Sequence, residues 1–232
     1  MNRVNTGILG LDALLQGGFP KPSSILLTGP SGTGKSIFGM QYLYNGAKDY
    51  AEPGFMINTE DYTTDFQWYQ EEFSWNFKTL QDKGLLVFSR YDPVDFAKFN
   101  LNTLYADIIM QVSKVIDSMG VKRVVFDSIS PIALAIDDKS VFRTVLYYIS
   151  KALKEKGCTT IFVAERPSSG SALTQYDVEQ FVMDGVLELS FAQKEDALVQ
   201  ALAIRKMKAT SVPQSRYVLD FYEEGLRIAP SY

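Results

Sequence analysis

The chain of 232 residues contains no histidine and only one cysteine, Cys158. The lack of histidine excludes histidine-based catalytic triads and most types of zinc site. A single cysteine cannot form an internal disulfide, which is typical of proteins from a reducing compartment. Cys158 opens an apolar segment, residues 158–164, so we expect a buried core thiol and not a reactive one.

Long apolar runs, charge blocks, internal repeats and low-complexity linkers are also missing. Without a run of 18 apolar residues, and without the apolar core of a signal peptide at the start, we expect a cytoplasmic protein with no membrane span. The net charge of −4 and the isoelectric point of about 5.0 provide no overall attraction to nucleic acid. The uniform composition favours one domain covering residues 1–232.

A glycine-rich segment at residues 29–36 is the strongest motif that the chain does contain. Its sequence fits the pattern G-x-x-x-x-G-K-[ST] of phosphate-binding loops and reads Gly29-Pro30-Ser31-Gly32-Thr33-Gly34-Lys35-Ser36. An apolar strand at 24–28 precedes it and a helix at 37–50 follows it, which is the context that the motif requires. A glycine-rich turn with a capping serine is the alternative, and this context argues against it.

The residue types in this loop suit the chemistry of a triphosphate. Glycines let the backbone curl so that successive N–H groups point inward, and the start of a helix adds partial positive charge. Lys35 is then placed to reach the β- and γ-phosphates, and the hydroxyl of Ser36 is placed to bind Mg²⁺.

Apolar strands and amphipathic helices alternate over the first 165 residues. We expect strands at 24–28, 54–60, 85–90, 122–128 and 158–164, and long helices at 37–50, 63–75, 101–119 and 138–156. Shorter helices are expected at 11–15 and 177–183, and loops at 91–100 and 129–137. This alternation predicts an α/β fold with a mostly parallel central sheet covered by helices on both faces.

The last part of the chain has a different pattern. Segments 185–192, 198–207, 216–222 and 226–228 read as strands with no long helix between them. They predict a C-terminal antiparallel meander at one edge of the sheet. Ligands bind such sheets at the carboxyl ends of the parallel strands, where the phosphate loop also lies.

Three acidic residues come at the ends of expected strands. Asp127 closes an apolar strand and is predicted to hold Mg²⁺ through a water, with Ser36 as a direct ligand. Glu60 ends the strand after the first long helix and is predicted to activate a water for attack on the γ-phosphate, with Asp61 in a supporting role. The alternative roles are capping of the next segment for Asp127, and surface acids at a strand end, opening the helix that follows, for the other two.

Two lysines near the end of a late strand, Lys206 and Lys208, lie on the same face because strand residues alternate. Two neighbouring cations repel each other unless an anion lies close to them. Solvated lysines that protect a sheet edge from aggregation are an equally good explanation, so the spacing leaves both readings open.

Taken together, these residues resemble the KaiC-like branch of the RecA superfamily of ATPases. The resemblance covers nearly the whole chain, and the ordered set of motifs is more specific than the phosphate loop alone. The matching segments are Thr6-Gly7 through Gly17-Gly18-Phe19-Pro20, the phosphate loop, Glu60-Asp61, Asp127-Ser128, Glu165-Arg166, residues 179–186 and residues 205–210.

This resemblance implies a RecA-like P-loop core that binds ATP and Mg²⁺, with Glu60 as the catalytic carboxylate. It also implies a homo-oligomeric ring, commonly hexameric, with ATP between subunits. Lys206, Lys208 and Thr210 would then reach the nucleotide of a neighbour. The family usually has Arg and Gly where this chain has Lys208 and Ala209, so we expect weaker stimulation across the interface, because lysine lacks the guanidinium fork.

Several functional hypotheses follow. The leading one is a slow ATPase that acts as an oligomeric switch or motor on a protein partner. The circadian-clock members of the family carry two such domains and a C-terminal phosphorylated tail, so autokinase activity is not expected here. A second hypothesis is a DNA-repair accessory that binds single-stranded DNA, but the expected DNA-facing loops, 129–137 and 166–176, contain only one basic residue, Arg166. A third is a nucleotide-binding scaffold with little hydrolysis.

Overall fold

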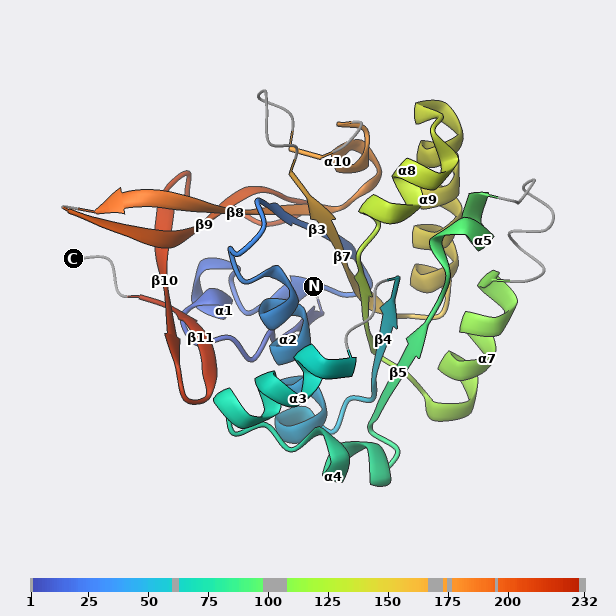
Figure 1. Ribbon diagram of the computed structural model, residues 1–232, viewed down its shortest axis with the longest axis horizontal. Coiled ribbons are helices and arrows are strands. Elements are labelled where there is room, and N and C mark those ends of the chain that lie inside the picture. The colour runs from blue at the N-terminus through green and yellow to red at the C-terminus, as the bar shows by residue number, and fades with distance from the viewer. Residues whose placement is uncertain are drawn as a thin grey trace.

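A central sheet of nine strands with helices on both faces forms the computed structural model of the chain (Figure 1). The structure describes residues 2–59, 63–97, 108–166, 173–174, 177–194 and 196–229. The strand order is β11-β10-β9-β8-β3-β7-β6-β4-β5. The strands are β3 (Ser24–Gly29), β4 (Gly54–Asn58), β5 (Leu86–Arg90), β6 (Arg123–Asp127), β7 (Thr159–Glu165), β8 (Gly185–Lys194), β9 (Ala197–Met207), β10 (Arg216–Tyr222) and β11 (Gly225–Ile228). A small separate sheet pairs β1 (Arg3–Val4) with β2 (Phe19–Pro20).

The pairing directions confirm the predicted fold class. Strands β8, β3, β7, β6, β4 and β5 run parallel to one another, and β8 to β11 form the antiparallel C-terminal meander. The chain moves from β3 to one side of the sheet, returns through β6 and β7, and then continues on the other side at β8. Such a switch in strand order opens a crevice at the carboxyl ends of the strands.

The helices separate into groups on the two faces of the sheet (Figure 1). They are α1 (Leu11–Leu14), α2 (Lys35–Tyr50), α3 (Thr63–Glu72), α4 (Phe77–Asp82), α5 (Pro93–Ala97), α7 (Met110–Met119), α8 (Ser130–Ile136), α9 (Lys139–Glu155) and α10 (Glu179–Val182). Among the helices that the structure describes, none has the length and apolar character needed to span a bilayer.

Each face of the sheet has its own hydrophobic core, because strands covered on both sides are apolar at nearly every position. On the face of α2, Val125 packs with Phe38 and Met56. On the opposite face, Phe126 packs with residues of α7, α8 and α9, including Phe142. This burial on both faces fixes the register of the parallel strands, and with it the positions of their carboxyl ends.

A buried arginine lies at the opposite, amino end of β6. Arg123 is 1% exposed, and its Nη2 atom is 2.7 Å from Oε2 of Glu52. Its guanidinium also lies 4.8 Å from the ring centre of Tyr42. This ion pair is far from the carboxyl edge and serves below as a structural reference.

Three short helices differ from the predictions. The expected loop at 129–137 contains α8, with Pro131 in its first turn, where proline needs no hydrogen bond. The expected loop at 91–100 contains α5. The expected helix 63–75 ends at Glu72, and α4 begins after Asn76, whose side chain accepts a hydrogen bond from the N–H of Thr79. The first part of the expected helix 101–119 lies outside the described residues.

Candidate functional site

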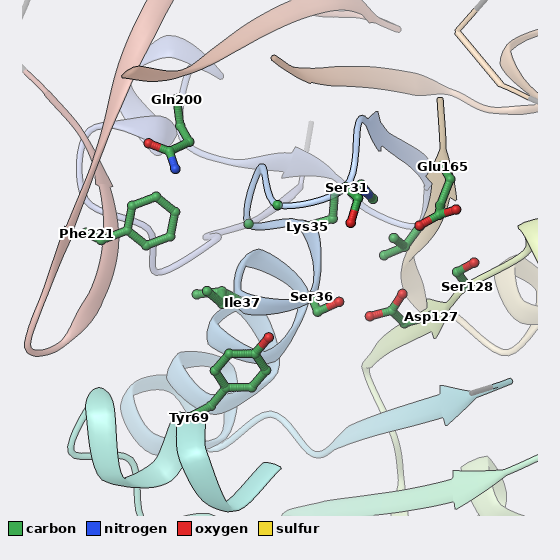
Figure 2. A pocket seen from close by; sticks show the side chains of 13 residues that line it. Ser31, Lys35, Ser36, Ile37, Tyr69, Asp127, Ser128, Glu165, Gln200 and Phe221 are labelled. Carbon is green, nitrogen blue, oxygen red and sulfur yellow. The ribbon is translucent and has the colours of Figure 1, made fainter. Parts of the chain in front are cut away.

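A cavity of about 400 Å³ opens at the carboxyl ends of β3, β6 and β7 (Figure 2). Its walls come from the loop after β3, the first turn of α2, and parts of α3, β9 and β10. It is lined by Ser31, Gly32, Gly34, Lys35, Ser36, Ile37, Tyr69, Asp127, Ser128, Val163, Glu165, Gln200 and Phe221. Five residues of the phosphate-loop motif therefore line one cavity together with Asp127.

The loop of residues 29–34 owes its shape to glycine at two positions. Gly32 and Gly34 have φ angles of +78° and +93°, which residues with a Cβ atom rarely adopt. A Cβ atom on Gly34 would also lie 2.7 Å from Cζ of Phe221. The hydroxyl of Thr33 donates to the carbonyl of Pro30 at 2.8 Å and closes the loop from inside.

Lys35 lies at the start of α2 and is 8% exposed. Its Nζ atom donates to the carbonyl oxygens of Gly29 and Pro30, each at 2.9 Å. The ammonium group is thus held against the loop, at the wall of the cavity and at the positive end of the helix dipole. This position favours binding of an anion.

Asp127 ends β6 and is 1% exposed. The next residue, Ser128, is fixed to the end of β4: the Thr59 hydroxyl donates to its carbonyl at 2.7 Å, and its N–H donates to the Thr59 hydroxyl at 3.1 Å. The peptide bond between Asp127 and Ser128 is cis. The Ser36 and Asp127 side chains point toward each other across the cavity (Figure 2). A hydroxyl and a carboxylate are oxygen donors of the kind that Mg²⁺ prefers, so these residues fit that ion.

Seven residues of the cavity wall were not among the predicted site residues: Ile37, Tyr69, Ser128, Val163, Glu165, Gln200 and Phe221. Tyr69 on α3, Gln200 on β9 and Phe221 on β10 come from distant parts of the chain, and no local pattern marks them. Glu165 at the end of β7 is exposed, and its N–H donates to the hydroxyl of Ser130 at 2.8 Å. Two signals in the sequence pointed to Glu165: its position at a strand end, and the Glu165-Arg166 segment of the family resemblance.

Lys206 and Lys208 lie away from this cavity, beside the turn between α10 and β8. The Nζ atom of Lys206 donates to the carbonyls of Gln180 at 3.1 Å and Met183 at 2.7 Å. Nζ of Lys208 lies 2.8 Å from Oδ1 of Asp184. Burial, and then the charge of Lys208, lower the pKa of Lys206 below its usual value. Within a single chain, Asp184 is therefore the anion that accompanies the two lysines.

The remaining predicted residues are placed as follows. Thr210 accepts a hydrogen bond at 3.0 Å from Nη2 of Arg3 in β1 and does not line the cavity. Glu60 and Asp61 lie outside the described residues, although β4, which leads to them, ends beside Asp127. Cys158 is fully buried, as expected, and burial raises the pKa of its thiol to about 11.

Comparison with known proteins gives matches along the whole chain. The model of a family described as the KaiC ATPase matches residues 4–232. A UPF0273 protein of Methanopyrus kandleri is 30% identical over 247 residues, which cover 99% of this chain and 93% of that protein. The circadian clock oscillator protein KaiC of Parathermosynechococcus lividus is 31% identical over 233 residues, which cover 98% of this chain but 42% of KaiC.

A solved structure gives the same result. The crystal structure of a KaiC-like protein from Pyrococcus horikoshii is 32% identical, has a TM-score of 0.84, and matches over 99% of both chains. The family and the RecA-like fold predicted from the sequence motifs are both confirmed. The chain belongs to the KaiC family of ATPases.

Proposed function

We propose that this protein is a slow, Mg²⁺-dependent ATPase that works as a homo-oligomeric switch on a protein partner. The observation that supports this function best is the cavity in which the phosphate loop, Lys35, Ser36 and Asp127 meet. Each of these groups has a task in binding a triphosphate, and they come from two strands and one helix that the sheet brings together.

The phosphate loop would hold the anionic part of ATP. Backbone N–H groups around Gly32 and Gly34, together with the start of α2, offer donors and partial positive charge to phosphate oxygens. Lys35 would exchange its bonds to the carbonyls of Gly29 and Pro30 for bonds to the β- and γ-phosphates. Hydrogen bonds between charged groups are stronger than those to neutral carbonyls, so the exchange favours bound nucleotide.

Ser36 and Asp127 would hold the Mg²⁺ ion. When bound, Mg²⁺ neutralises negative charge on the β- and γ-phosphates. Glu60 is the proposed general base that orients the attacking water, with Asp61 beside it. Glu165 adds a second carboxylate to the wall of the cavity, so variants of both glutamates are needed to assign the base.

The nucleoside would bind at the end of the cavity lined by Ile37, Tyr69 and Phe221. Figure 2 shows Phe221 and Gln200 on the side of the phosphate loop opposite Asp127. Aromatic rings bind nucleobases by stacking, and the amide of Gln200 can form hydrogen bonds with either the base or the sugar.

Assembly into a ring, with ATP between subunits, would bring Lys206, Lys208 and Thr210 to the nucleotide of the neighbouring subunit. The side chain of Lys208 is 60% exposed and would have to exchange Asp184 for a phosphate. Because lysine offers no bidentate fork, we expect modest stimulation of hydrolysis by the neighbour, consistent with a slow switch.

Phosphate release, measured beside light scattering with and without Mg·ATP, tests this function. The proposal predicts assembly on Mg·ATP, slow release of phosphate, and loss of release in Glu60→Gln. Glu165→Gln should retain hydrolysis. Hydrolysis by Glu60→Gln equal to that of wild type would show that Glu60 is not the base, and a monomer under all conditions would refute the role of the lysines. Binding without any hydrolysis would support a scaffold instead.

A further inference from the structure

A buried carboxylate next to the phosphate loop binds two arginines. Glu188 on β8 is 1% exposed. Its Oε1 atom accepts a hydrogen bond from Nη1 of Arg166 at 2.9 Å, and its Oε2 atom accepts one from Nε of Arg205. A charge in the interior needs such partners, because its desolvation costs more than one partner usually returns.

The first arginine connects Glu188 to the wall of the cavity. Arg166 directly follows Glu165, which lines the cavity. The N–H of Arg166 donates at 3.1 Å to the carbonyl of Gly29, and the same carbonyl accepts from Nζ of Lys35. The backbone of Arg166 is therefore bonded to the phosphate loop, while its side chain is bonded to Glu188.

The second arginine connects Glu188 to the surface. The side chain of Arg205 is 45% exposed, and Arg205 directly precedes Lys206 on β9. Glu188 itself lies opposite Thr28 on β3 and Ala203 on β9. The carboxylate thus bridges the exposed side of β9 and the strand that leads into the phosphate loop.

We propose that Glu188 is a positioning residue for the nucleotide site and that it couples the surface of β9 to the phosphate loop. By holding Arg166, it fixes the Gly29 carbonyl and the backbone at Glu165. Because Glu188 also binds Arg205, the positions of the Gly29 carbonyl and of the backbone at Glu165 depend on what Arg205 contacts. This inference rests on the proposed binding of ATP in the cavity, although neither Glu188 nor Arg205 lines that cavity.

The test is the affinity for Mg·ATP of the full chain and of the variants Glu188→Gln and Arg205→Gln, measured by calorimetry together with kcat, KM and Tm. Removing one partner of a buried charge pair leaves the other charge unpaired and disturbs the residues around it. We therefore expect about tenfold weaker binding of Mg·ATP for Glu188→Gln and about threefold weaker binding for Arg205→Gln. The double variant should bind no more weakly than Glu188→Gln alone, because coupled residues are not additive. KM should rise more than kcat falls.

A matched control separates positioning from stability. Glu52→Gln removes a carboxylate from another ion pair with one buried partner, Arg123, at the opposite end of the sheet. It should lower Tm while leaving ATP affinity within about twofold of wild type, because it is remote from the cavity. If Glu188→Gln lowers Tm in the same way without weakening ATP binding, Glu188 is only structural.

The two proposals fail in different ways. Absence of ATP binding by the wild-type chain would refute the proposed function. Normal binding by wild type together with unchanged binding by Glu188→Gln would refute only the positioning role. If Glu188→Gln does not fold, Arg205→Gln still decides the coupling, because Glu188 keeps its bond to Arg166 in that variant. Unchanged affinity for Mg·ATP in Arg205→Gln would refute the coupling between β9 and the phosphate loop.

Discussion

Phe221 gives a sharp test of where the nucleoside binds. Its ring lies on β10, is 37% exposed, and packs so close to the phosphate loop that a Cβ atom on Gly34 would be 2.7 Å from its Cζ. Phe221→Ala removes this ring from the cavity while leaving Lys35, Ser36 and Asp127 in place.

The expected loss follows from the strength of aromatic stacking. Stacking of a base on one aromatic side chain contributes about 1–3 kcal/mol, which corresponds to a roughly 5- to 150-fold weaker affinity for ADP or ATP. Inorganic triphosphate has no base, so its affinity should stay within about twofold. Because the ring is already partly exposed, its removal should lower the free energy of unfolding by only about 1 kcal/mol.

Calorimetric titration of ADP and inorganic triphosphate is the assay, and Phe191→Ala is the matched control. Phe191 on β8 is 39% exposed and also lies against the loop, 3.7 Å from a Cβ placed on Gly32, but it does not line the cavity. Phe191→Ala should bind both ligands like wild type. Unchanged ADP affinity in Phe221→Ala, or an equal loss for inorganic triphosphate, would refute this position of the nucleoside.

Three further predictions concern other parts of the chain. Lys35→Met should weaken ATP binding by about 10- to 100-fold, because a charge-assisted hydrogen bond is lost, with unchanged circular dichroism; a change below about twofold in a nucleotide titration would contradict it. Burial opposes ionisation of Asp184, but hydrogen bonds from Lys208, a backbone N–H and Lys154 lower its pKa. Its ionised form therefore stabilises the fold above about pH 4 and stops doing so as pH falls through the lowered pKa. In urea titrations, Asp184→Asn should lower the free energy of unfolding by about 2 kcal/mol at neutral pH. A loss that does not shrink toward pH 3 would argue against the pairing of ionised Asp184 with Lys208 and Lys154. Because burial raises the pKa of Cys158 to about 11, iodoacetamide at pH 8 should modify it far more slowly in native than in unfolded protein, and rapid native modification would disprove its burial.

Local patterns were sufficient to predict most of the fold. The alternation of strands and helices gives a parallel sheet, and the four late strands without helices give the antiparallel edge. Patterns were insufficient where segments are short. Helix α8 has seven residues, too few for a clear helical period. Helix α4 depends on a cap at Asn76 that the aromatic residues around it obscured.

The candidate site also has one part that the sequence predicts and another that it does not. The residues from Gly29 to Ser36 form a contiguous motif, so the sequence predicts them together. Tyr69 and Phe221 reach the cavity only because the fold brings α3 and β10 to the phosphate loop, and contacts between residues so far apart in sequence leave no local pattern. The contact of Glu188 with Arg205 depends on the pairing of β8 with β9, whose register shifts between Val186 and Leu187.

The central claim is that Asp127 and the phosphate loop together form a Mg·ATP site. Calorimetric titration of ATP into wild type and Asp127→Asn, each with Mg²⁺ and with EDTA, tests it most directly. The account predicts one nucleotide per chain, tighter binding with Mg²⁺ in wild type, and loss of that Mg²⁺-dependent gain in Asp127→Asn. Absence of ATP binding by wild type, or the same gain from Mg²⁺ in Asp127→Asn, would contradict it.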